Sequence, residues 1–556
     1  MHGQGMRNGD ALITSARREW DASHKPCFIL PVQTRPRTPF NSSPLTPLPQ
    51  SHRCDKMVGT KFLKAVRPNE SKRSAIRKRP RTGETVSGRR GPKSVRQLFI
   101  EEMQGLCKGD WVGALHALRV AKECGTHLDN HMYCACINVM AKNKRWEEAV
   151  ALLQDMRKYG ISPDVVTYTA VIHACRNGRQ WKVAVFLLED MRNNGVFPNV
   201  YSYSAAITAC GEGGQWERAV SLLEEMSADG VYPDFISYNA AIDACGKKGQ
   251  WEWALSLLDD MPRNGVFPDV GSYAATIKAC GNGGQWEKAL ALLEEMQRKG
   301  VSPDVRTYNR VITACGKGGK WEHVLSLLKE MPAKGVAPDV VSYNACIDAC
   351  GKSGQWEEAL SLLREMRNQE ISPDVISFTV AINACRHGRQ WRRAVSLLEE
   401  MRDIGVSPNV YSYSVAIAAC GDGGQWEQAL SLLDEMPDKG VSPDAGSFST
   451  AIEACGNCAQ WEQALSLLKN MSGKGVSANV FCYNAAINAC HRGGQWKQAL
   501  ILLENMLQEG VSSNACTYTT VIEACNDAGQ WEEAWRCWRT SQLKGFRQVS
   551  APVTRL

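Results

Sequence analysis

Cysteine is the residue type in this chain that first suggests a chemical role, because cysteines bind zinc or form disulfides. The chain has 22 cysteines, and eleven of them recur every 35 residues from Cys175 to Cys525. Cys455 and Cys458 form a Cys-x-x-Cys pair, but zinc needs four converging ligands and no second pair lies nearby. The periodic cysteines stand beside alanine and isoleucine, which favours small buried side chains and reduced thiols. The sequence therefore predicts no metal site and no cofactor.

The cysteine spacing belongs to a repeat that must set the fold. Tryptophan recurs at the same 35-residue interval from Trp111 to Trp531. Framed to start just after the Pro-Asp or Pro-Asn pair, twelve units run from 130–164 (unit 1) to 515–549 (unit 12). A weaker repeat at 95–129 keeps the tryptophan and is expected to cap the array, and residues 550–556 form a tail. Such regularity indicates a solenoid.

Unit 4 (235–269) shows what each repeat should form. Helical spacing links the apolar residues Tyr238, Ala241, Ile242 and Cys245 and, further on, Trp251, Ala254, Leu255, Leu258 and Met261. Ser237 is expected to cap the first helix, and Gly246 with Gly249 and Gln250 to break it. Gly265 suits a left-handed C-terminal cap. We predict an all-α, right-handed superhelical solenoid of helix-turn-helix repeats, 35 residues each.

Charge divides the chain into two parts. Residues 1–94 hold 20 Lys and Arg against 6 Asp and Glu, whereas the remaining chain is acidic by seven charges. The first segment is also rich in proline and is expected to be disordered. Its basic run at 72–81 could contact RNA, address a nucleus or end a cleaved transit peptide. No apolar stretch reaches the length of a membrane-spanning helix.

The 35-residue period, the unit FISYNAAIDACGKKGQWEWALSLLDDMPRNGVFPD and the junction G-V-x-P-D resemble the pentatricopeptide repeat (PPR) family, in its P-type subclass. The resemblance implies single-stranded RNA binding at one base per repeat. It also implies a site of action in chloroplasts or mitochondria, with nucleus or cytoplasm as the alternative.

In that family two residues of each unit chiefly read the base, and they correspond here to positions 5 and 35. The pairs are Cys134/Asp164, Thr169/Asn199, Ser204/Asp234, Asn239/Asp269, Ala274/Asp304, Asn309/Asp339, Asn344/Asp374, Thr379/Asn409, Ser414/Asp444, Ser449/Asn479, Asn484/Asn514 and Thr519/Val549. The family's pairing tendencies give 5′-AGUNUUAGAY-3′ for units 2–11, with the letter of Ala274 open. The alternative interpretation is that Thr, Ser and Asn near a helix start are caps.

The resemblance also suggests base-stacking and phosphate contacts. Position 2 holds the stacking candidates Val166, Tyr201, Ile236, Val341, Ile376, Tyr411 and Phe481, and ordinary interface packing is the alternative. Lys247, Lys317, Lys352 and Arg492 at the end of the first helix are phosphate candidates, against the alternative of solvated surface charges. Segments 179–207 and 389–417 are nearly identical and lie 210 residues apart, which indicates a duplicated six-unit block.

No appended catalytic domain is expected. A deaminase-like tail would need His-x-Glu with a Cys-x-x-Cys pair, and none of the ten histidines stands in a His-x-Glu motif. The sequence predicts a monomeric, non-enzymatic RNA-binding protein that could recruit a processing enzyme and does not bind membranes. The rival hypothesis is a helical scaffold for a protein partner.

Overall fold

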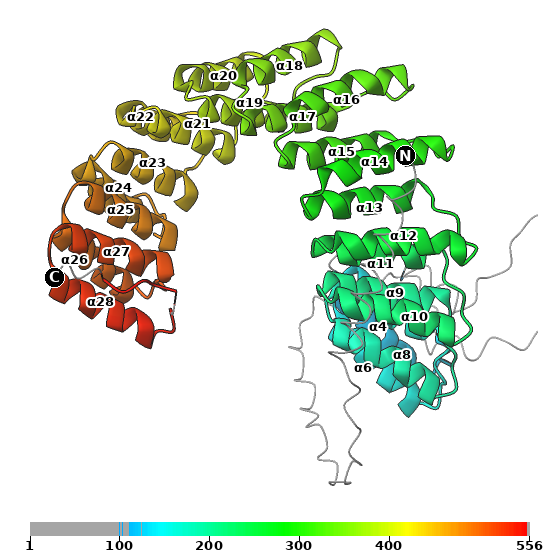
Figure 1. Cartoon of the computed structure of the whole chain (residues 1–556). Coiled ribbons are helices and arrows are strands. Elements are labelled where there is room, and N and C mark those ends of the chain that lie inside the picture. The colour runs from blue at the N-terminus through cyan, green and yellow to red at the C-terminus, as the bar shows by residue number, and fades with distance from the viewer. Residues whose placement is uncertain (1–98, 100–102, 104–109, 124, 547, 553–556) are drawn as a thin grey trace, which may run out of the picture. The chain divides into compact units, whose positions relative to one another are not determined.

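The computed structural model describes residues 99, 103, 110–123, 125–546 and 548–552. The predicted basic segment 1–94, with its proposed transit peptide, lies outside these residues. The described chain contains 25 α-helices, each 13 residues long, and no strand. Figure 1 shows them following one another as hairpins. The prediction of an all-α repeat solenoid is confirmed.

Each unit contributes a first and a second helix. The first helices are α5 (Asn130–Lys142), α7 (Val165–Asn177), α9 (Val200–Glu212), α11 (Phe235–Lys247), α13 (Val270–Asn282), α15 (Val305–Lys317), α17 (Val340–Lys352), α19 (Val375–His387), α21 (Val410–Asp422), α23 (Ala445–Asn457), α25 (Val480–Arg492) and α27 (Ala515–Asp527). The second helices are α6 (Trp146–Lys158), α8 (Trp181–Asn193), α10 (Trp216–Ala228), α12 (Trp251–Arg263), α14 (Trp286–Arg298), α16 (Trp321–Ala333), α18 (Trp356–Asn368), α20 (Trp391–Asp403), α22 (Trp426–Asp438), α24 (Trp461–Gly473), α26 (Trp496–Gln508) and α28 (Trp531–Leu543), preceded by α4 (Trp111–Glu123). Each first helix packs on the second helix of its unit and on the first helix of the next.

The cap of the first helix is not the one predicted. In unit 4 the N-cap is Asp234, whose backbone is extended and whose Oδ1 accepts the backbone N–H of Ser237 at 2.9 Å. Ser237 is therefore the third helical residue, and its hydroxyl donates to the same Oδ1 at 2.8 Å. Aspartate and serine are both good caps, so their identities alone could not decide which of them opens the helix.

The role predicted for Gly246 is also wrong. Helix α11 runs through Gly246 to Lys247, and the chain turns at Gly249, where φ is +71°. A Cβ on Gly246 would lie 2.9 Å from the Cβ of Ala279 in the next unit. The glycine is therefore needed for close approach of two first helices. The left-handed conformation predicted for Gly265 is confirmed, with φ of +75°.

The periodic tryptophans pack each unit against the next one. A Cβ on Gly283, just after α13, would lie 2.4 Å from Cδ1 of Trp251 in the preceding unit. The indole covers the turn of the next hairpin, which explains why tryptophan and glycine recur with the same period. In α12 the buried residues are Ala254, Leu257, Leu258 and Met261, and Trp251 and Leu255 are partly buried against the same core.

The periodic cysteines are core residues, as predicted. All eleven, from Cys175 to Cys525, have no exposed surface. Burial raises the pKa of the Cys175 thiol to about 12 and that of Cys280 to about 11. These thiols are protonated at neutral pH and act as small apolar side chains.

Candidate nucleic-acid interface

Position 35 caps the first helix of the following unit. Its Asp or Asn places Oδ1 2.8–3.1 Å from a backbone N–H of that helix, in every unit from Asp164 to Asn514. The cap fixes the side chain and leaves its second terminal atom free of hydrogen bonds within the described chain. That atom is an oxygen acceptor in Asp234 and a nitrogen donor in Asn199. The cap interpretation thus applies to position 35, and position 5 lies inside the helix.

An asparagine at position 5 contacts position 35 of its own unit. Asn309 Nδ2 donates to Asp339 Oδ1 at 3.1 Å. The same bond joins Asn239 to Asp269 at 3.4 Å, Asn344 to Asp374 at 3.3 Å and Asn484 to Asn514 at 3.4 Å. Because a carboxylate only accepts, it holds the amide nitrogen towards itself and so sets the orientation of the amide. Asn239 Oδ1 and Asn344 Oδ1 are buried without a hydrogen-bond partner, whereas Asn309 Oδ1 accepts the Ser342 hydroxyl at 2.6 Å.

A hydroxyl at position 5 reaches position 35 through one intermediate residue. Ser204 Oγ donates to the carbonyl of Val200 at 2.8 Å and lies 2.8 Å from the Ser237 hydroxyl, which donates to Asp234. Thr169, Thr379 and Ser414 make the equivalent contacts. Thr519 donates only to the carbonyl of Ala515, at 3.0 Å, and Ser449 is half-buried. The linking hydroxyl at position 3 was not predicted, although its constancy as Ser or Thr in most units was a signal.

Hydrogen bonding keeps several of the position-35 carboxylates ionised. Burial alone would raise the pKa of Asp269, but hydrogen bonds from the backbone and hydroxyl of Ser272 and from Asn239 bring the pKa below its ordinary value. The same balance lowers the pKa of Asp164, Asp339 and Asp374. At neutral pH these side chains offer acceptors only.

Position 2 lies beside positions 5 and 35 of the preceding unit and faces solvent. A Cβ on Gly271 would lie 3.2 Å from both Asn239 Nδ2 and Asp269 Oδ1, which places position 2 next to the preceding pair. All seven stacking candidates are exposed, from Ile236 at 45% to Tyr201 and Phe481 at 67%. A flat or branched apolar side chain exposed beside polar readers can bracket a base.

Two units lack a polar side chain at position 5 or at position 35. Ala274 is buried and has no polar side-chain atom, although Asp304 caps α15 in the usual way. Val549 is buried, and its carbonyl accepts the indole N–H of Trp538 at 3.2 Å. In unit 1, the half-buried Cys134 thiol accepts a hydrogen bond from Asn138 at 3.7 Å.

The phosphate candidates lie at the other end of the first helices, about 16 Å from position 2 at 1.5 Å per residue. Lys247 Nζ lies 2.7 Å from Glu212 and 3.1 Å from Asp243. Lys317 donates to Asn282 Oδ1 at 2.9 Å and Lys352 to Asp348 at 2.6 Å, while Arg492 is exposed. Most of this basic charge is therefore already opposed by neighbouring oxygen atoms.

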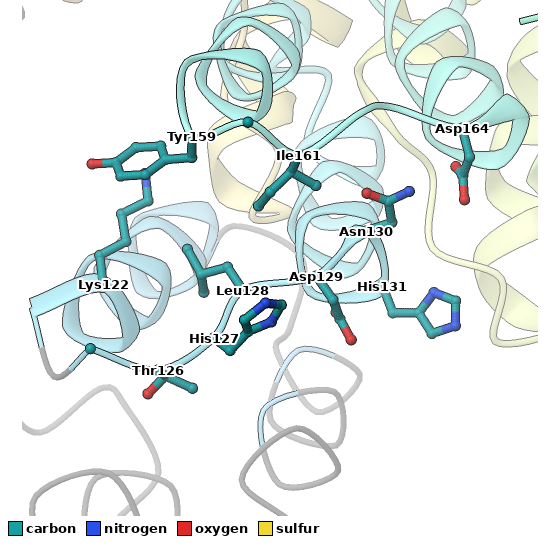
Figure 2. A pocket seen from close by; sticks show the side chains of 12 residues that line it. Lys122, Thr126, His127, Leu128, Asp129, Asn130, His131, Tyr159, Ile161 and Asp164 are labelled. Carbon is teal, nitrogen blue, oxygen red and sulfur yellow. The ribbon is translucent and has the colours of Figure 1, made fainter.

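A pocket of about 810 Å³ opens between the loop that precedes α5 and the loop that follows α6, at the two ends of unit 1 (Figure 2). It is lined by His127 and Asp129 of the preceding loop, by His131 at position 2, and by Asp164 at position 35. Lys122 borders it, with Nζ 4.5 Å from the centroid of the Tyr159 ring. Positions 33, 35 and 2 thus meet at one edge of the array.

The described residues offer little else for chemistry. They hold no group of three His, Cys, Asp or Glu side chains placed to bind a metal ion. Within the same part of the chain, no helix has both the length and the apolar character needed to cross a membrane.

Comparison with known proteins identifies the family of the chain. Models of the PPR repeat family match residues 233–282, 338–387 and 478–527, and those of the pentatricopeptide repeat domain match 118–175, 151–213 and 291–353. A PPR repeat model matches 201–231, 272–301, 376–406, 411–441, 446–476 and 516–546. No curated protein matches the sequence.

Solved structures are similar at low identity. PPR10 from maize is 23% identical, with a TM-score of 0.43 over 82% of this chain and 79% of that one. Yeast Rmd9p, solved in complex with a 16-nt target RNA, is 12% identical, with a TM-score of 0.41 over 83% of this chain and 98% of that one. The family models together span most of the chain, so it belongs to the pentatricopeptide repeat family.

Proposed function

We propose that units 2–11 read single-stranded RNA, one base per unit, at a site close to 5′-AGUNUUAGAY-3′. The observation that carries the proposal is the cap at position 35. In units 2–11 Oδ1 caps the next helix, and the second terminal atom is an oxygen in some units and a nitrogen in others. The array therefore presents an ordered series of acceptors and donors.

That series matches the Watson–Crick edges of purines. Guanine offers N–H donors at N1 and N2, which suit the free carboxylate oxygen of Asp234 or Asp444. Adenine offers an acceptor at N1, which suits the free amide of Asn199, Asn409 or Asn479. The small hydroxyl at position 5 leaves space for the larger base.

The asparagine units match pyrimidines. In units 4, 6 and 7 the carboxylate at position 35 holds the amide nitrogen of position 5 towards itself, at 3.1–3.4 Å. The other N–H of that amide can donate to O4 of uracil, and the second carboxylate oxygen of position 35 can accept N3–H. In unit 11 the second terminal atom of Asn514 is an amide nitrogen, which can donate to N3 of cytosine or to O4 of uracil.

The test is binding of the full chain to labelled AGUNUUAGAY RNA, beside a scrambled strand and a duplex of the same sequence. Measurements at two salt concentrations separate readout from the nonspecific contribution of the basic segment 1–94. Tight binding to the intended strand alone is the expected result. Equal binding of target and scramble would contradict base reading.

A protein scaffold is the second candidate function, favoured by the exposed acids of the second helices, such as Glu217 and Glu224. It predicts that none of the three nucleic acids binds above the level of the basic segment. We further propose that the chain acts on chloroplast or mitochondrial transcripts as a binder without nuclease activity. RNA recovered intact after incubation with Mg²⁺ is the expected result.

A further inference from the structure

Three aromatic rings stand exposed at the same position of consecutive units. Phe197, Tyr232 and Phe267 occupy position 33 of units 2, 3 and 4 and are 81%, 85% and 82% exposed. At position 33 the other units from 1 to 11 hold serine or, in unit 6, alanine. Single exposed apolar side chains are ordinary, but three in register, two residues before a reader, form an organised surface.

Position 33 lies on the edge of the array that carries the readers. In unit 1 the carbonyl oxygen of Ser162, at position 33, accepts a hydrogen bond from Asn130 Nδ2 at 3.1 Å. Asn130 also helps to lower the pKa of Asp164, which lies two residues further along the same loop. One loop earlier, His127 at position 33 lines the same pocket as Asp164 and His131 (Figure 2). A ring at position 33 therefore borders the space in which a base would sit.

We propose that Phe197, Tyr232 and Phe267 form a stacking row that holds the first three nucleotides of the bound RNA, those read by units 2–4. This inference rests on the proposed RNA-binding function. One ring per unit matches one base per unit, and each ring shares its loop with the reader at position 35. Base–aromatic stacking is tolerant of sequence, so the row adds affinity at the 5′ end without changing the letters.

The duplicated block supplies an internal comparison. Units 2 and 8 carry the same reader pair, Thr with Asn, and units 3 and 9 both carry Ser with Asp. Their positions 33 differ, since Ser407 and Ser442 stand where units 2 and 3 have Phe197 and Tyr232. The letters A and G are thus assigned to units 2 and 3, which have an aromatic ring at position 33, and again to units 8 and 9, which have none.

The experiment uses the full chain and the triple variant F197S/Y232S/F267S, which installs the residue found at this position in most other units. The control variant is S407A/S442A/S477A. Each protein is titrated with the target strand, extended at both ends, and with strands in which either the first or the second A-G pair is abasic. Thermal melting by circular dichroism checks that the exposed substitutions leave the fold intact.

Making the first A-G pair abasic should weaken binding by the wild-type chain more than making the second pair abasic. For the triple variant the two changes should weaken binding equally. On the intact strand the triple variant should bind at least about tenfold more weakly than wild type, and the control variant should not change. Wild-type affinity of the triple variant, or an equal loss on intact and first-pair abasic strands, would overturn the stacking row while leaving base reading in place. Failure of wild type to distinguish target from scramble would instead refute the proposed function.

Discussion

The amide of Asn309 donates to the carboxylate of Asp339 at 3.1 Å, although thirty residues separate them in the chain. The same carboxylate oxygen accepts the backbone N–H of Ser342 at 2.8 Å and thereby caps α17. One side chain thus joins the helix start of one unit to position 5 of the unit before it, which we propose reads the base. Changes at position 35 should consequently separate stability from readout.

Asp339→Asn should relax the letter read by unit 6 and leave the fold intact. Asparagine caps as well as aspartate, so the free energy of unfolding should change by less than about 0.5 kcal/mol. The second carboxylate oxygen, an acceptor for N3–H of uracil, becomes an amide nitrogen that can donate to N3 of cytosine, so the preference for uracil over cytosine should fall about tenfold. Binding to two strands that differ at that letter measures the change.

Asp339→Ala is the matched control, because it removes the cap as well as the reader and should cost about 1 kcal/mol of stability. An Asp339→Asn protein that kept the full preference for uracil would contradict the role given to this carboxylate.

Asn239→Thr should change the third letter from U to G. The substitution creates the Thr-with-Asp combination, in which a short hydroxyl leaves room for guanine opposite the free oxygen of Asp269. Affinity for AGGNUUAGAY should rise and that for AGUNUUAGAY should fall, each by about tenfold. The reciprocal strands provide the control, and equal losses on both would indicate damage to the fold rather than a changed letter.

The solenoid was predictable because its determinants repeat: the apolar spacing of Tyr238, Ala241 and Ile242 and the turn at Gly265 recur in similar form along the chain. The two wrong predictions, those for Ser237 and Gly246, have one cause. The same residue type can play several structural roles, and the sequence alone does not show which role it plays. Gly246 looks like a helix breaker, and its actual partner, Ala279, lies in the next unit, where a local pattern gives no information. The contacts between positions 5 and 35 were likewise inaccessible to spacing arguments, and only family resemblance singled out those positions.

Acid should weaken the array through its caps. The pKa values of Asp164, Asp269, Asp339 and Asp374 lie below the ordinary value in the folded chain, because hydrogen bonds to the carboxylates outweigh their burial. Their contribution is therefore complete above the unfolded pKa of about 4 and is lost as pH falls through the folded values.

The quadruple variant D164N/D269N/D339N/D374N should keep neutral caps and lose less stability than wild type between about pH 5 and pH 3. Thermal melting across that range measures the difference. Asp438→Asn, in the exposed last turn of α22, is the control and should follow wild type. Parallel curves for wild type and the quadruple variant would refute the contribution of the caps.

Reaction with an alkylating reagent should distinguish the exposed cysteines from the buried ones. Cys516 is exposed and should alkylate in the native chain, with Cys134 and Cys458 reacting more slowly because they are partly covered. The eleven periodic thiols are buried and protonated, so they should react only on unfolding. Mass spectrometry of labelled peptides, with and without denaturant, assigns each site. Rapid native labelling of Cys245 would contradict its place in the core.

Gly246→Ala should destabilise the chain through the contact between units. The added methyl would lie 2.9 Å from Ala279 Cβ and 3.1 Å from its Cα, so two first helices must separate. Overpacking of this kind costs about 1–3 kcal/mol, more than alanine gains in helix propensity.

Gly473→Ala is the matched control, since Gly473 ends helix α24 with no atom within 4 Å of the added Cβ. That variant should be neutral or stabilised by up to about 1 kcal/mol. Urea unfolding of both proteins decides the matter, because a Gly246→Ala chain as stable as Gly473→Ala would mean that the first helices do not need this close approach.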